Sequence, residues 1–189
     1  MSSAAVVHVR DAAPEDAAPI AAIGSAGFSG SYATILAPAV IDAVTEQTYS
    51  LDAVADCVRR CVATPDAQFL VAERDEQVVG FLHFDSEGPE PELHRIYVDP
   101  TQTGGGIGAA LLGDLHRRLP AGATYILMVL APNTGAIRFY QRHGLEIERE
   151  TDAASHRKDT MGFAPPYTPR VPALIMRYRR VAVDVTAKV

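Results

Sequence analysis

The glycine-rich segment Gly104–Ala109 (Gly-Gly-Gly-Ile-Gly-Ala) constrains the fold of this chain most, because it separates two apolar segments of different period. Residues 92–98 before it alternate apolar and polar side chains, as a strand does. Residues 107–119 after it place leucines on one helical face. A glycine-rich turn that opens a helix exposes unpaired backbone N–H groups at the positive end of the helix dipole. The segment therefore predicts a phosphate-binding turn between a strand and a helix.

The rest of the sequence predicts a mixed α/β fold in one domain over residues 1–189. Strands are predicted at residues 6–10, 69–73, 78–84, 92–98, 125–130, 145–148 and 173–183. Helices are predicted at about 14–26, 38–46, 51–63 and 107–119, and from Asn133 to just before Gly144. The polar turn 74–77 indicates a hairpin, and the polar, proline-rich residues 152–172 indicate a long loop before the last strand.

The composition excludes several classes of protein. Hydrophobic residues make up 48% of the chain and charged residues 21%, as in ordinary globular domains. No apolar run approaches the roughly 20 residues that span a bilayer, so we expect no membrane partner. The N-terminus has neither a basic region nor a long apolar stretch, which predicts no secretory signal and a cytoplasmic protein.

The net charge of −6 is unevenly divided along the chain. Residues 1–90 hold 4 Lys/Arg and 14 Asp/Glu, a charge of −10, whereas residues 91–189 hold 13 and 9, a charge of +4. The acidic total, without a basic stripe interleaved with aromatic residues, argues against nucleic-acid binding. The acidic half either favours a cationic partner or is an unevenly charged, solvated surface.

Two cysteines, Cys57 and Cys61, lie four residues apart on a predicted helix. That spacing suits a metal, but no second Cys/His pair accompanies it, so we expect two small half-buried side chains. The histidines show no metal-ligand spacing either. We therefore expect no metal site.

The spacing Gly104-x-Gly106-x-x-Ala109 fits the dinucleotide-binding pattern G-x-G-x-x-G/A. Three features argue against a nicotinamide or flavin site. The turn lies past the middle of the chain, five residues separate the strand from the first glycine, and the next strand offers no acid for a ribose hydroxyl. A nucleoside-triphosphate loop is also excluded, because no Lys-Ser/Thr pair follows the glycines.

Residues 98–112 resemble the acyl-CoA loop of the GNAT superfamily of N-acetyltransferases, whose pattern is Gln/Arg-x-x-Gly-x-Gly/Ala after a strand ending Val-x-Pro. Residues 133–145 are similar to its second signature, Asn-x-x-Ala-x-x-Phe-Tyr-x-x-x-Gly-Phe. The resemblance implies a mixed, mostly antiparallel sheet of six to seven strands, flanked by helices and splayed at the acyl-CoA site. Two positions depart from the pattern: Thr103 replaces Gln or Arg, although Gln102 is adjacent, and Gly105 replaces Lys or Arg. Both changes leave mainly backbone donors for phosphate.

The resemblance also implies which residues contact the cofactor. Backbone N–H groups of the glycine turn would hold the pyrophosphate, and the backbone of the strand before it would pair with the pantetheine amides and polarise the thioester oxygen. Asn133 either caps its helix only or also touches the cofactor. The expected cofactor-binding residues are Ile96, Val98, Thr103, Gly104, Gly105, Gly106, Gly108, Ala109 and Asn133.

Two residues are expected to act in catalysis. Tyr140 is the predicted general acid toward the CoA sulfur, because a phenol keeps its proton at neutral pH; alternatively, it packs one helix face. Glu92 matches the position where some family members carry a general base, although others use ordered water, and an acid at this strand end is as readily explained by solvation. His94 is a lesser candidate base. Arg138 or Arg142 either meets the 3′-phosphate or belongs to a solvated, charged helix face.

The predicted function is transfer of an acyl group, most readily acetyl, from acyl-CoA to a primary amine of a small molecule, peptide or protein. Direct attack in a ternary complex is expected, because neither signature contains a cysteine to carry the acyl group. The alternative is a non-catalytic acyl-CoA-binding module of the same fold. Tyr32, Tyr49 and residues 152–172 are where we expect substrate selectivity or the contact of a homodimer.

Overall fold

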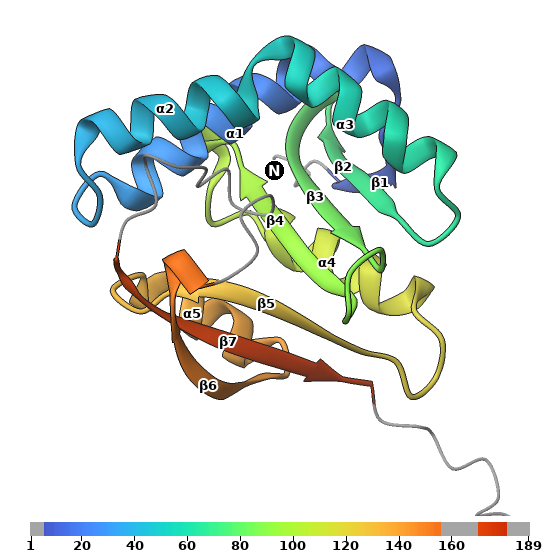
Figure 1. The fold of residues 1–189 in the computed structure, drawn as a ribbon. Coiled ribbons are helices and arrows are strands. Elements are labelled where there is room, and N and C mark those ends of the chain that lie inside the picture. The colour runs from blue at the N-terminus through green and yellow to red at the C-terminus, as the bar shows by residue number, and fades with distance from the viewer. Residues whose placement is uncertain (1–5, 156–169, 181–189) are drawn as a thin grey trace, which may run out of the picture.

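The computed structural model describes residues 6–155 and 170–180, which form a seven-stranded sheet in the order β1-β2-β3-β4-β5-β7-β6 (Figure 1). All neighbouring strands pair antiparallel except β4 and β5. The strands are β1 (His8–Asp11), β2 (Gln68–Arg74), β3 (Gln77–Asp85), β4 (Glu92–Val98), β5 (Thr124–Leu130), β6 (Leu145–Asp152) and β7 (Pro172–Arg179). The predicted mixed, mostly antiparallel fold is confirmed.

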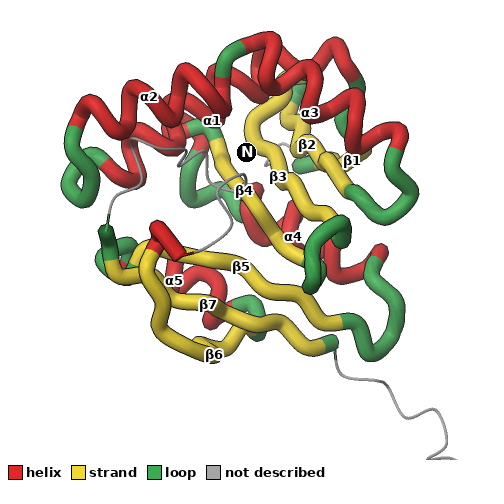
Figure 2. The backbone as a smooth tube through the Cα atoms, in the orientation of Figure 1, coloured by secondary structure: helices red, strands yellow, loops and turns green. Residues whose placement is uncertain are grey.

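Helices cover both faces of this sheet (Figure 2). Three helices lie on one face: α1 (Ala17–Tyr32), α2 (Pro38–Tyr49) and α3 (Leu51–Ala63). Two lie on the other: α4 (Ile107–Arg118) and α5 (Thr134–Arg142). Alternation along the strands sends side chains to both layers. In β2, for example, Val71 joins the core under α1–α3, and Leu70 joins the core under α4.

The strands β4 and β5 part almost as soon as they meet. Their register contains one pair, Glu92 with Ile126, and the Ile126 N–H donates to the Pro91 carbonyl at 2.9 Å. Beyond that point the two strands diverge, which Figure 1 shows as a wedge between β4 and β5. The expected splay is present, and it leaves the β5-facing edge of β4 without a ladder among the described residues.

The element boundaries differ from the predicted ones where local geometry extends a regular segment. Helix α1 follows a 3₁₀ turn at Pro14–Asp16 and continues to Tyr32, whereas its predicted end is near residue 26. The β2–β3 hairpin closes through Asp75 and Glu76, both at positive φ (50° and 62°). That geometry matches the twist of two-residue hairpins.

Most of the predicted proline-rich loop, residues 156–169, lies outside the described residues, as do residues 181–183 of the predicted last strand. No helix of the described chain has the length and apolarity to cross a bilayer.

Arg10 ties β1 to the start of α1 and to β2. Its guanidinium donates to both carboxylate oxygens of Asp16, at 2.7 and 2.9 Å, and to Oε1 of Glu73 at 2.9 Å. Burial alone would raise the pKa of Asp16, but hydrogen bonds from Arg10 and from the Ala13 N–H outweigh burial and lower that pKa. Asp16 therefore holds its charge in the fold more strongly than in the unfolded chain.

Asp16→Asn is expected to reduce the free energy of unfolding at pH 7 by about 1.5–3 kcal/mol, the range for a hydrogen bond to a charged group. A lowered folded-state pKa stabilises the fold above the unfolded pKa of about 4, and this contribution is lost as pH falls through the lowered value. The difference between wild type and variant, measured by urea unfolding, should therefore shrink below about pH 4. Asp56→Asn, in an exposed pair with Arg59, is the control and should change little. If the difference in free energy of unfolding between wild type and Asp16→Asn stayed constant with pH, the electrostatic explanation would be wrong.

Candidate functional site

A cavity of about 490 Å³ fills the wedge between β4 and β5. We call it the cleft. Its walls are β4 from Leu93 to Val98, two residues of β5, the C-terminal half of α1 with Tyr32, and the start and middle of α5. The parting of the strands thus creates a channel along β4, and the side chains of Ile96 and Val98 pack against the core under α4.

The glycine turn borders a second cavity of about 380 Å³. Val98 and Thr103 line both cavities, so the cleft continues into the turn. Gly104 and Gly106 have positive φ (80° and 73°), and Gly106 is the N-cap of α4 without a side-chain cap. A methyl group added at either glycine would meet nothing within 4 Å. The backbone at the helix start therefore faces open space beside unpaired N–H donors.

Gly105, between these two glycines, faces away from this space. A methyl group there would collide with the Arg74 guanidinium. That guanidinium donates to Gln102 Oε1 at 3.0 Å and to the Gly105 carbonyl at 3.3 Å. Arg74 ends β2, some 30 residues before the turn, so the sequence analysis missed it. It brings a positive charge to a loop that lacks a basic side chain of its own, while Arg142 lines the cavity itself.

Asn133 and Tyr140 reach the cleft from α5. Asn133 Oδ1 accepts from the Ala136 N–H at 3.2 Å, so the predicted cap is present, and the residue lines the cleft as well. Burial raises the pKa of Tyr140 above its ordinary value, and the nearby Tyr32 raises it further by a smaller amount. The phenol therefore stays protonated at neutral pH, and it lines the cleft.

Glu92 lies at the point where the two strands part, and its side chain is 7% exposed. Its Oε1 is 4.0 Å from Nδ1 of His94, whose Nε2 bonds to Asp85 Oδ2 at 2.7 Å. Burial would raise the pKa of Asp85, but the interaction with His94 outweighs it and lowers the pKa. Among the described residues Glu92 does not line the cleft itself, while His94 does. The polar chain from Asp85 to Glu92 is therefore joined to the cleft through His94.

The two cysteines do not stand alone, contrary to the expectation from sequence. Cys57 and Cys61 are buried on α3, and the fold brings His83 of β3 against both. The sequence did not reveal this cluster, because His83 lies more than 20 residues from the cysteines along the chain. Only the packing of α3 against β3 brings the three side chains together.

Residues 65–147, which include β2 to α5 and both signatures, match the acetyltransferase (GNAT) domain model. Over 150 residues the chain is 24% identical to the spermidine N(1)-acetyltransferase of Thermoplasma acidophilum, covering 78% of this chain and 92% of that protein. A segment of 81 residues is 41% identical to the mycothiol acetyltransferase of Streptomyces griseus. It covers 40% of this chain and only 26% of that protein.

Solved structures share the fold around this segment. The PaiA N-acetyltransferase of Thermoplasma acidophilum, solved in complex with coenzyme A, superposes with a TM-score of 0.72 at 20% identity and covers 92% of this chain and 99% of its own. YncA of Salmonella typhimurium, an acetyltransferase solved with acetyl-CoA, has a TM-score of 0.68 at 17% identity, covering 92% and 94%. The domain match, the two signatures and the shared fold agree: residues 65–147 of this chain are similar to the GNAT domain of acetyltransferases.

Proposed function

We propose that this protein transfers an acetyl group from acetyl-CoA to a primary amine by direct attack in a ternary complex. The observation that carries the proposal is the open edge of β4, which runs from the glycine turn into a cleft with Tyr140 on its wall. An open strand edge pairs with amides of an extended ligand, and a helix start with free N–H groups binds phosphate. Coenzyme A has both chemistries in one molecule.

In this proposal the backbone N–H groups of Gly104, Gly106, Gly108 and Ala109 bind the pyrophosphate. Arg142, which lines this cavity, supplies the charge that Thr103 and Gly105 do not, and Arg74 holds the turn through its bond to the Gly105 carbonyl. The pantetheine arm lies along Ile96 and Val98, and Asn133 borders its path. This arrangement directs the thioester toward the middle of the cleft.

Two proton transfers complete the reaction. The amine must lose a proton before or during attack, and we assign this to Glu92, reached through ordered water because Glu92 lies just outside the cleft. The departing CoA thiolate must gain a proton, which Tyr140 donates from a phenol that burial keeps protonated. A backbone N–H of β4 stabilises the oxyanion.

We propose a cationic amine as the acceptor. The first 90 residues, which include helix α1 on the cleft wall, carry a charge of −10. A field of that sign concentrates cations. The similarity to a spermidine acetyltransferase supports the same class.

Thiol release from acetyl-CoA is expected with polyamines and other cationic amines, and to be weaker with neutral or anionic ones. The measurement is an amine panel read by a thiol reagent, with acetyl-CoA alone as the control for hydrolysis. In parallel, acetyl-CoA at about 100 times its dissociation constant should stabilise the fold by roughly 2.7 kcal/mol, whereas NAD(P) should not. Stabilisation without turnover on any amine would instead favour the non-catalytic binding module.

A further inference from the structure

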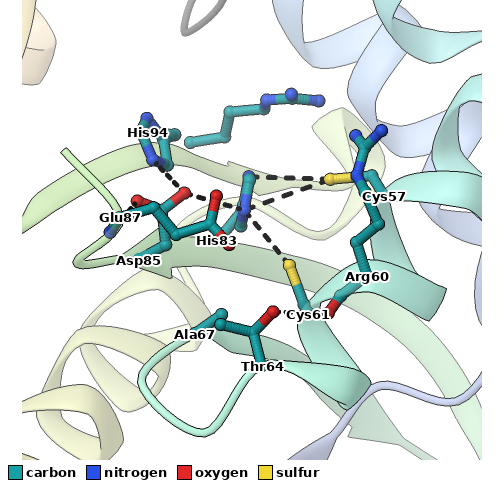
Figure 3. A pocket seen from close by; sticks show the side chains of 10 residues that line it. Cys57, Arg60, Cys61, Thr64, Ala67, His83, Asp85, Glu87 and His94 are labelled. Carbon is teal, nitrogen blue, oxygen red and sulfur yellow. Dashed lines mark hydrogen bonds and ion pairs between the residues drawn. The ribbon is translucent and has the colours of Figure 1, made fainter.

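A third cavity, of about 420 Å³, lies between α3 and the strands β3 and β4 (Figure 3). Cys57 and Cys61 project into it from α3, one turn apart and therefore on one helical face. His83 and Asp85 come from β3. Cys57, Cys61 and His83 are only 7%, 9% and 7% exposed, so their polar atoms are shielded from water.

The donor atoms gather around one ring nitrogen, Nε2 of His83. Cys61 Sγ lies 3.3 Å from it, Asp85 Oδ2 3.8 Å, and Cys57 Sγ 4.0 Å. The two sulfur atoms and a ring nitrogen are all within 4.8 Å of one another. The ligands of a tetrahedral zinc ion, each roughly 2.0–2.3 Å from the metal, stand about 3.5 Å apart. The two distances from sulfur to Nε2, 3.3 and 4.0 Å, bracket that value.

We propose that Cys57, Cys61 and His83 bind one Zn²⁺ ion and leave its fourth position to water, because Asp85 groups with His83 and His94 rather than with the two sulfur atoms. Two sulfur ligands and an imidazole select a borderline-soft ion over magnesium or calcium, which take oxygen ligands. The donor atoms therefore favour zinc, and the ion can reach them through the cavity.

The surroundings suit an ion of this kind. Two thiolates and a neutral imidazole balance the charge of Zn²⁺, and the side chains of Arg60 and Arg95 line the same cavity. Asp85 stands beside the imidazole of His83 and accepts from His94 Nε2 at 2.7 Å and from the Glu87 N–H at 3.2 Å. Hydrogen-bonded carboxylates of this kind are common in the outer shell of metal sites.

The site has a structural consequence for the cleft. Zinc at this position would link helix α3, through its two cysteines, to strand β3, through His83. His94 and Arg95 line both this cavity and the cleft, so the ion fixes a shared wall. Loss of the metal is therefore expected to loosen α3 without removing any group that we place against acetyl-CoA.

The test is a cobalt titration of the full chain after chelation under reducing conditions. One Co²⁺ per chain should bind with thiolate-to-cobalt charge-transfer absorption and the visible bands of a tetrahedral site, and one equivalent of Zn²⁺ should abolish both. Zn²⁺ should also raise the melting temperature. Cys61→Ser and His83→Asn should lose affinity by more than the roughly 10- to 100-fold typical of an outer-shell change. Glu87→Gln removes a carboxylate from the same cavity and should leave binding unchanged.

Circular dichroism of each metal-free variant shows whether it folds, and the wild-type titration decides the question without any variant. A reduced wild-type chain that takes up neither cobalt nor zinc overturns the proposal. So does binding that His83→Asn leaves intact, or a disulfide between Cys57 and Cys61 in the purified protein. Acetyl transfer enters none of these readouts, so the zinc site stands or falls independently of the proposed reaction.

Discussion

Replacing Tyr140 with phenylalanine is expected to lower kcat for acetyl transfer about 100-fold, the lower range of what a positioned general acid contributes. The phenol lies on the cleft wall, and its removal leaves the thiolate to take its proton from water. Acetyl-CoA affinity should not change, because the contacts proposed for the cofactor are made by the glycine turn and β4. Single-turnover rates, compared with steady-state rates, separate the chemical step from product release.

Tyr178→Phe is the matched control for this variant. Tyr178 is another partly buried tyrosine, stacked on His116 with ring centroids 3.9 Å apart, and it lines neither the cleft nor the cavity of the glycine turn. It should retain the wild-type kcat. Burial raises the pKa of Tyr140 above the ordinary value near 10, so its ionisation should not shape the pH–rate profile below about pH 10. Full activity of Tyr140→Phe at every pH would remove the residue from the mechanism.

The elements of this fold were predictable where the signal is periodic and local. The helix 51–63 and the glycine turn at the start of α4 are found at their predicted places, and Asn133 caps α5 as expected. The extension of α1 to Tyr32 was not predictable, because Gly27 and Gly30 interrupt its apolar pattern while packing against the sheet holds the helix together.

The contents of the site were less predictable, because they depend on strand register. A register shift in β3–β4 pairs Phe84 with Leu93 and His83 with Arg95, so His94 is the extra residue. Such a bulge re-aims side chains, and here the ring of His94 lies 4.8 Å from that of His83. The approach of Arg74 to the glycine turn likewise follows from the β2–β3 hairpin. Sequence spacing contains none of this information.

Gly106→Ala is expected to raise KM for acetyl-CoA about tenfold or more and to leave kcat nearly unchanged. The added methyl group enters the open space that the pyrophosphate occupies in our proposal, and it separates the phosphate from the N–H groups at the start of α4. Loss of one hydrogen bond to a charged group costs about 1.5–3 kcal/mol, and each 1.4 kcal/mol is a tenfold change in affinity. Equilibrium binding of CoA measures the effect without turnover.

Gly122→Ala separates this effect from backbone strain. Gly122 also has a positive φ, 77°, and a methyl group there also meets nothing within 4 Å, but the residue lies in the turn before β5, away from the glycine cavity. Both variants should lose stability by about 1–2 kcal/mol, because a side chain in the left-handed region is strained in either turn. Only Gly106→Ala should also lose CoA affinity. Equal CoA affinity in the two variants would mean that the glycine turn reverses the chain without binding phosphate, and the cofactor would have to enter the cleft by another route.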